Sequence, residues 1–282
     1  MIEQFQHRLT NSFFLWFDNY LLTKGQAYTN TTGTFFNYDD DRLDSSYNVF
    51  GSAYKQWVND SSITGATIPS GIYANNSFVP RSPNLILDFE NGRVLSSNLS
   101  DTTKITGSFS IKDFNVYFSN ETEEDLIVEN KYDINSRIIL NDETYIMPYD
   151  YVVPAIFLSV ESMNNKSFAL GGLEETNIRA KAVVISENNY QLDGALSIFA
   201  DSKNEVFAGI PMADHPYNEY NDLKTGFYSY TDLKNKYDNE TKFYINSVNT
   251  SKLTDKSRKS LTSDIYVGFI DFEIQQHRYR HQ

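Results

Sequence analysis

A rich supply of aromatic side chains constrains the fold of this sequence more than any other feature. The chain has 20 tyrosines and 20 phenylalanines, and aromatic residues occupy 15% of its 282 positions. Large flat rings prefer the pleated, half-buried surface of a sheet, where they pack across neighbouring strands. Hydrophobic residues at 40% and charged residues at 22% are typical of a globular protein that buries a core. We therefore expect a mainly β protein.

Alternating apolar and polar residues locate the expected strands. The clearest run is LILDFENGRVL from Leu85 to Leu95, in which Glu90, Asn91 and Gly92 provide the turn of a hairpin. Further strand-like runs occupy residues 104–118, 155–160, 178–186 and 265–274, and a short helical spacing follows at 192–199. The pattern predicts a β-sandwich or β-barrel-like core over residues 84–282, with α+β as the alternative class.

Residues 1–25 have the spacing of an amphipathic helix. Apolar side chains recur every three or four positions, and Gly25 follows the last of them. Such a face packs either on the chain's own sheet or on a neighbouring subunit, and terminal elements are often held by partners. The candidate subunit interface consists of the residues Phe5, Leu9, Phe13, Trp16, Phe17 and Tyr20.

In two further stretches the apolar residues have no regular spacing. Residues 26–83 are polar and aromatic and are interrupted by glycine and proline, which predicts a loop-rich aromatic arm that lies against another surface. Residues 211–238 are polar and rich in tyrosine, which predicts a long loop inserted into the β-rich core. The expected division is therefore a helix at 1–25, an arm at 26–83 and a core at 84–282.

Charge and composition exclude several classes of function. The formal net charge of −13 repels phosphate backbones, so we expect no specific nucleic-acid binding, although an acidic wall also suits a channel through which DNA slides. Cysteine is absent, which excludes disulfides and thiolate metal sites. No apolar run approaches the length of a membrane span, and residues 1–10 lack the order of a secretory signal, so we expect no membrane association.

Candidate catalytic and metal-binding residues do not form a recognisable set. Asp214 and His215 are adjacent, but neighbours in an extended segment point apart. The acidic run 39–41 with Asp44 lacks the glycine and the final glutamate of a calcium loop. No phosphate-binding glycine motif is present. We therefore assign no catalytic residue, no metal and no cofactor, and we expect a protein that is not an enzyme.

Several segments resemble structural proteins of tailed bacteriophages, in particular a group from marine phages. They are LLTKGQAYTN at 21–30, FENGRVL at 89–95, KDFNVYF at 112–118, EEDLIVENKY at 123–132, FALGGLEET at 168–176 and YVGFIDFEI at 266–274. The resemblance implies a virion component made in the bacterial host cytoplasm, most simply a subunit of a homo-oligomeric ring in the head-to-tail connector or neck. A tail or baseplate position is also compatible with it, and other virion proteins would be its partners.

Two alternatives from other classes stay open. The tyrosine- and tryptophan-rich loops would suit a carbohydrate-binding protein, such as a baseplate or tail-tip adhesin, because aromatic rings stack on sugars. A glycosidase-like enzyme would need only two carboxylates, whose separation depends on the fold. Aromatic residues are spread along the whole chain instead of gathered in one loop, which favours assembly over both alternatives.

Overall fold

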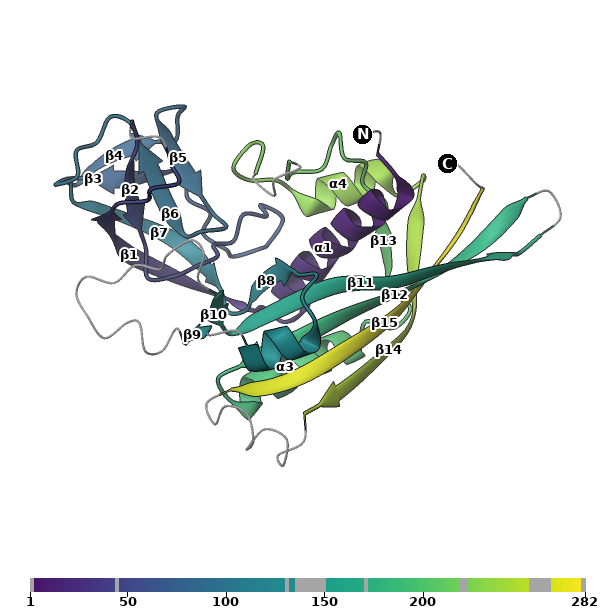
Figure 1. Ribbon diagram of the computed structural model, residues 1–282. Coiled ribbons are helices and arrows are strands. Elements are labelled where there is room, and N and C mark those ends of the chain that lie inside the picture. Colours follow the sequence, from purple (N-terminus) through teal and green to yellow (C-terminus); the bar gives the residue numbers. More distant parts are fainter. Residues whose placement is uncertain are drawn as a thin grey trace.

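The structure is a computed structural model, and it describes residues 3–43, 46–129, 132–134, 151–169, 172–218, 223–253 and 265–279. Two sheets make up most of it, and helices pack on the second (Figure 1). The expected mainly β class, with an N-terminal helix and a few short helices, is confirmed. None of the helices in the described part is long and apolar enough to cross a membrane.

The first sheet has seven short strands in the order β4-β3-β7-β1-β2-β6-β5. Its core is aromatic: Trp57 stacks on Phe109 with ring centroids 4.6 Å apart and meets Phe35 and Phe89 edge-on. These rings are at most 3% exposed, so the first sheet encloses a core of its own. Its strands are β1 Tyr28–Tyr38, β2 Asn48–Gly51, β3 Gly71–Ala74, β4 Ser77–Pro80, β5 Leu85–Asp88, β6 Arg93–Ser96 and β7 Ile105–Lys112.

This sheet corrects the expectation that residues 26–83 form a separate arm. Strand β1 pairs with β7 along eight residues, from Tyr28 opposite Lys112 to Phe35 opposite Ile105, so the expected boundary at residue 83 runs through the middle of one sheet. Because the segment can bury its aromatic residues against strands that come later in the chain, it needs no second surface to cover them.

The second sheet has longer strands in the order β13-β14-β15-β12-β11-β8. Strands β12 and β15 pair antiparallel along 14 residues, from Leu173 opposite Tyr279 to Ser186 opposite Tyr266. Strand β8 lies parallel to the start of β11. The strands are β8 Asn115–Phe118, β11 Ala155–Ser167, β12 Leu173–Ser186, β13 Val206–Ala208, β14 Lys242–Lys252 and β15 Tyr266–Tyr279; β9 Tyr132–Ile134 and β10 Tyr151–Val153 form a small parallel pair.

Helices cover one face of the second sheet. Helix α1, Phe5–Lys24, and helix α3, Asn189–Ala200, meet where Phe17 stacks on Phe199 at 3.9 Å, and both rings pack on Phe272 of β15. The expected helix at residues 1–25, with Gly25 as its C-cap, is confirmed. A π-helical turn, η1 Asp125–Glu129, contributes Leu126 and Ile127 to a small core on the opposite face of the sheet.

The stretch from 211 to 238 is not only a loop. It contains helix α4, Tyr230–Tyr237, and in its described part it buries four tyrosines in the main core: Tyr217, Tyr228, Tyr230 and Tyr237. The segment therefore belongs to the body of the protein, between the start of α1 and the first sheet, because its aromatic rings find apolar surface there.

Candidate binding groove

The second sheet continues past the point where β8 stops pairing with β11, and one of its faces there is polar. Residues 159–167 of β11, 173–179 of β12 and 273–279 of β15 form this part, which we call the β-extension (Figure 1). In the described part of the chain, no strand pairs with the outer edge of β11 after Leu158. Nine residues of strand span about 30 Å. Residues 161–167 are all exposed, so this strand edge is open to solvent.

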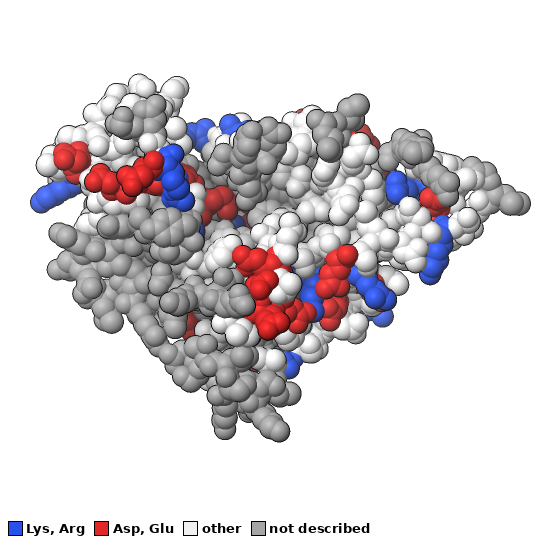
Figure 2. Space-filling view, viewed as in Figure 1, with Lys and Arg blue, Asp and Glu red and all other residues white. Residues whose placement is uncertain are grey.

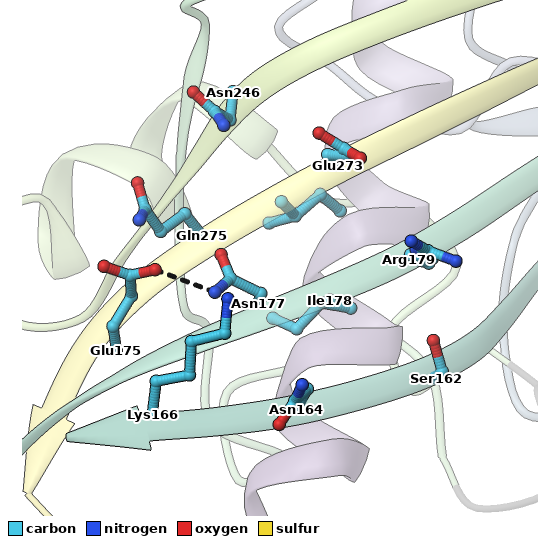
Figure 3. Close-up of a pocket in the computed structure, with 11 residues that line it drawn as sticks. Ser162, Asn164, Lys166, Glu175, Asn177, Ile178, Arg179, Asn246, Glu273 and Gln275 are labelled. Atoms are coloured by element: carbon cyan, nitrogen blue, oxygen red, sulfur yellow. Dashed lines mark hydrogen bonds between the residues drawn. The ribbon is translucent and has the colours of Figure 1, made fainter.

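One face of the β-extension carries polar side chains in rows across the strands. Strand register sets Lys166 opposite Glu175, Asn164 opposite Asn177, and Ser162 opposite Arg179. The rows continue onto β15, where Gln275 is opposite Asn177 and Glu273 is opposite Arg179. Figure 3 shows these side chains on one side of the strands and helix α1 on the other. With Asn246 of β14 they line a groove with a volume of about 600 Å³.

The charges of the groove balance each other. Lys166 faces Glu175 and Arg179 faces Glu273 across the strands, so each cation has a carboxylate directly opposite. Asn177 Nδ2 donates a hydrogen bond of 2.7 Å to Glu175 Oε1, and this bond, with one from Gln275, lowers the pKa of the Glu175 carboxyl group. The floor of the groove therefore offers fixed charges of both signs together with amide donors and acceptors.

Exposed aromatic side chains border the groove on the same face. Tyr279 lies opposite Leu173, and Tyr244 of β14 lies opposite Gln275. The ring of Phe168 contacts that of His277 with centroids 4.3 Å apart. Phe168, Tyr279 and Tyr244 are 56%, 48% and 45% exposed. Exposed rings beside a polar surface are typical of an interaction site, since aromatic residues carry much of the binding energy at interfaces.

The arrangement suits binding and offers no evident catalyst. No serine or threonine of the groove has a histidine base within hydrogen-bond distance among the described contacts. Nor is any group of three or more His, Asp or Glu side chains placed to hold a metal ion within the described residues. What the groove can do is hold an extended polar segment by hydrogen bonds and by charges of both signs.

The six residues of the candidate subunit interface lie elsewhere. Leu9, Phe13, Trp16, Phe17 and Tyr20 are at most 8% exposed and belong to the main core; Phe5 is partly buried, against Phe243 and under the guanidinium of Arg278. This corrects the expectation that they pack on a neighbouring subunit. The inner face of the second sheet is itself apolar, and α1 covers it within the same chain.

Within the described ranges, the acidic and histidine residues that the sequence offered as metal ligands do not come together in one site either. Asp40 accepts hydrogen bonds from Arg42 at 2.9 Å and from Arg93 at 2.6 Å, and these guanidinium groups hold the pKa of its carboxyl group well below the usual range. Asp44 lies outside the described residues. His215 is buried, with its ring nitrogens 3.3 Å from backbone oxygens of Asn11 and Tyr217, whereas Asp214 pairs with Lys236. Asp214 and His215 therefore do not share a ligand.

Sequence reasoning missed the groove residues. The signal present in the sequence is the recurrence of polar residues at every second position, as in Glu175, Asn177 and Arg179 on β12 and Glu273, Gln275 and His277 on β15. Alternation of this kind predicts a strand with one solvent-exposed face, but it does not tell which strands lie next to each other.

In comparisons with known proteins, neither a protein-family model nor a curated protein matches the sequence. The fold and the groove define the class as a mainly β protein with two large sheets and an open polar groove.

Proposed function

We propose that this chain is a structural subunit of a bacteriophage virion, in the head-to-tail connector, the neck or the tail, and that it acts through contacts with other subunits. It is not an enzyme in this proposal, and it needs no cofactor. The segments that resemble phage structural proteins support it, since they extend from residue 21 to residue 274.

The β-extension is the observation that carries the proposal. It presents an open strand edge, a polar groove and exposed aromatic rings on the face of the sheet that the main core leaves uncovered. Free strand edges are sites at which another chain can pair, and proteins usually keep them short or covered. A long projecting edge with a groove beside it therefore suits a subunit that is covered by neighbours in an assembly.

A homo-oligomeric ring that surrounds a DNA channel is the assembly we favour. The net charge of −13 would keep such a wall from holding DNA. Among the described residues on the face shown in Figure 2, acidic and basic side chains lie beside each other in mixed clusters. In this proposal that face contacts other virion proteins, and a channel wall would lie on another side.

Two measurements on purified particles of the phage that encodes this chain test the proposal. Quantitative mass spectrometry should find the chain in several copies per particle, in a ratio to the portal protein that fits a ring. Cryo-electron microscopy should place the two-sheet body in the neck or tail, with the β-extension against a neighbouring subunit. Particles that lack the chain altogether would overturn the proposal.

A carbohydrate-binding role at the baseplate or tail tip is the second candidate. Amide side chains in a groove beside Tyr244 and Tyr279 have the chemistry of a sugar site, which favours it. Both tryptophans, however, are core residues that no ligand can reach, Trp16 at 3% and Trp57 at 1% exposed. A glycan array separates the candidates: specific binding that Tyr244→Ala abolishes would support the adhesin, and an empty array would exclude it.

A further inference from the structure

A buried polar cluster joins the first sheet to helix α1 and to the segment that precedes α4. Lys112 Nζ of β7 lies 2.8 Å from Asp18 Oδ1 of α1, and both side chains are at most 1% exposed. Asn59 Nδ2 donates to Tyr217 Oη at 2.9 Å. The junction cluster, as we call it, consists of Asp18, Asn59, Asp60, Glu90, Lys112 and Tyr217, all of which are buried except Glu90, which keeps part of its surface exposed.

The cluster holds three carboxyl groups and one ammonium group. Lys112 is in direct contact with Asp18, which balances one carboxylate. Asp60 accepts four hydrogen bonds, three at Oδ1 from the backbone and hydroxyl of Ser62 and the backbone of Tyr230, and one at Oδ2 from Asn19. Among the hydrogen bonds and ion pairs of the described residues, the third carboxyl group, that of Glu90, has no cation in direct contact and only two donors.

Glu90 lies in the turn between β5 and β6, where two neutral groups donate to it. Tyr217 Oη donates to Glu90 Oε1 at 2.8 Å and Asn59 Nδ2 donates to the same oxygen at 3.1 Å. Burial raises the pKa of the Glu90 carboxyl group, and the attraction of Lys112 only partly opposes this effect. The pKa of the Tyr217 phenol is raised far above its ordinary value, so this hydroxyl stays neutral and remains a donor.

Unpartnered acceptors in the cluster point to a missing donor. Asp18 Oδ2 and Asn59 Oδ1 are fully buried, and neither accepts a hydrogen bond from any described residue. A buried acceptor without a donor destabilises the fold. A neutral carboxyl group carries one O–H donor that a carboxylate lacks, so removing a proton from Glu90 takes a donor away from a cluster that already holds unpartnered acceptors.

We infer that the junction cluster is a proton-binding site in which the neutral carboxyl group of Glu90 fastens the first sheet to α1 and to the segment around Tyr217. When solvent base removes this proton, the O–H bond breaks and a further negative charge appears near Asp18 and Asp88. The first sheet then loosens from the rest. The titratable groups that face Glu90 from the packed elements are Asp18, Asp88, Lys112, Tyr117, Tyr217 and Tyr228.

Glu90→Gln tests the inference because it makes the neutral state permanent. A carboxyl group with a higher pKa in the folded protein than its ordinary 4.5 stabilises the fold less and less as the pH rises toward the folded-state pKa. The two proteins should melt alike near about pH 5, and by about pH 8 the variant should melt higher by about 3 °C or more. A melting difference that stays constant over this range would overturn the inference.

Glu124→Gln is the matched control, since Glu124 is exposed and lies outside the cluster. It should follow the wild-type pH profile. A second measurement needs no variant: infrared spectroscopy of the wild-type protein with carboxyl-labelled glutamate should show the carbonyl band of a neutral acid at neutral pH, and this band should disappear on alkaline titration. Absence of the band at neutral pH would overturn the inference even if Glu90→Gln failed to fold.

Discussion

Gly92 shows how strictly a single position of the first sheet is determined. Its φ of +60° lies in the left-handed region, and a Cβ atom there would lie 1.7 Å from the carbonyl oxygen of Tyr54. The turn between β5 and β6 thus passes directly against the 52–57 segment, whose Ser52 N–H donates to the Gly92 carbonyl group at 2.9 Å. Both the backbone conformation and the available space require glycine.

Gly92→Ala should therefore lower the free energy of unfolding by at least about 2 kcal/mol, from backbone strain and overpacking together. Urea denaturation measures it. Gly194→Ala is the control: Gly194 is exposed within α3 and nothing lies within 4 Å of its added Cβ, so this change should stabilise by about 0.5 to 1 kcal/mol. Equal stabilities for the two variants would contradict the geometry of the turn.

Lys112 is the cation on which the buried charge balance of the junction cluster depends. Lys112→Met should cost about 3 to 5 kcal/mol of unfolding free energy, because it leaves Asp18 buried without its partner. Without the ammonium group the pKa of Asp18, already raised by burial, rises further, so the loss should grow with increasing pH. Chemical denaturation near about pH 5 and pH 8 measures both effects. Adding Asp18→Asn should restore part of the stability, and no recovery in the double variant would contradict the pairing.

At the scale of the elements, the sequence predicts the helices and strands in which apolar residues recur at a regular spacing. The α1 helix ends at Gly25 as its spacing indicates, and the hairpin turn at Glu90, Asn91 and Gly92 separates β5 from β6 as expected. Strand β1 was missed because most of its side chains are at least partly exposed, so apolar residues do not alternate along it. Its place is determined by pairing with β7, a contact distant in sequence.

The candidate groove could not be predicted in the same way. Asn164, Asn177 and Gln275 form one row only because β12 lies between β11 and β15 in one register. A shift by one residue would turn each side chain to the other face of the sheet. Likewise, the spacing of α1 predicts an apolar face but not which surface covers it, and the covering surface decides whether Phe13 is an interface residue or a core residue.

The β-extension yields a prediction of its own. In assembly, Arg179→Glu combined with Lys166→Glu should make the groove uniformly acidic and abolish oligomer formation or incorporation into particles, while the like charges that now face Glu175 and Glu273 lower the stability by no more than about 2 kcal/mol. Analytical ultracentrifugation and thermal melts measure the two effects. Lys104→Glu, on an exposed position outside the β-extension, is the control. Normal assembly of the double variant would show that the groove is not part of the subunit interface.

Across the whole molecule, the two sheets are joined too closely to behave as independent domains. Only Asp113 and Phe114 separate β7 from β8. Gln56 lies in the segment that packs on the first sheet. Its side chain accepts a hydrogen bond from Val116 N at 2.9 Å and donates one to Val116 O at 3.0 Å, which is the pattern that a neighbouring strand of the second sheet would make with Val116. Tyr228 N donates to Asn59 O at 3.0 Å across the same boundary. Loss of one sheet would leave these buried groups without partners.

The two tryptophans allow this coupling to be measured, because Trp57 lies in the core of the first sheet and Trp16 in that of the second. Trp16→Phe leaves a fluorescence signal from the first core alone, and Trp57→Phe leaves one from the second alone. In each variant the fluorescence and far-ultraviolet circular dichroism transitions in urea should coincide near neutral pH. Because ionisation of Glu90 weakens the junction, the fluorescence midpoint of Trp16→Phe should fall below the circular dichroism midpoint at alkaline pH. Separate transitions already at neutral pH would show that the sheets unfold independently, and the buried cluster would then have no part in holding them together.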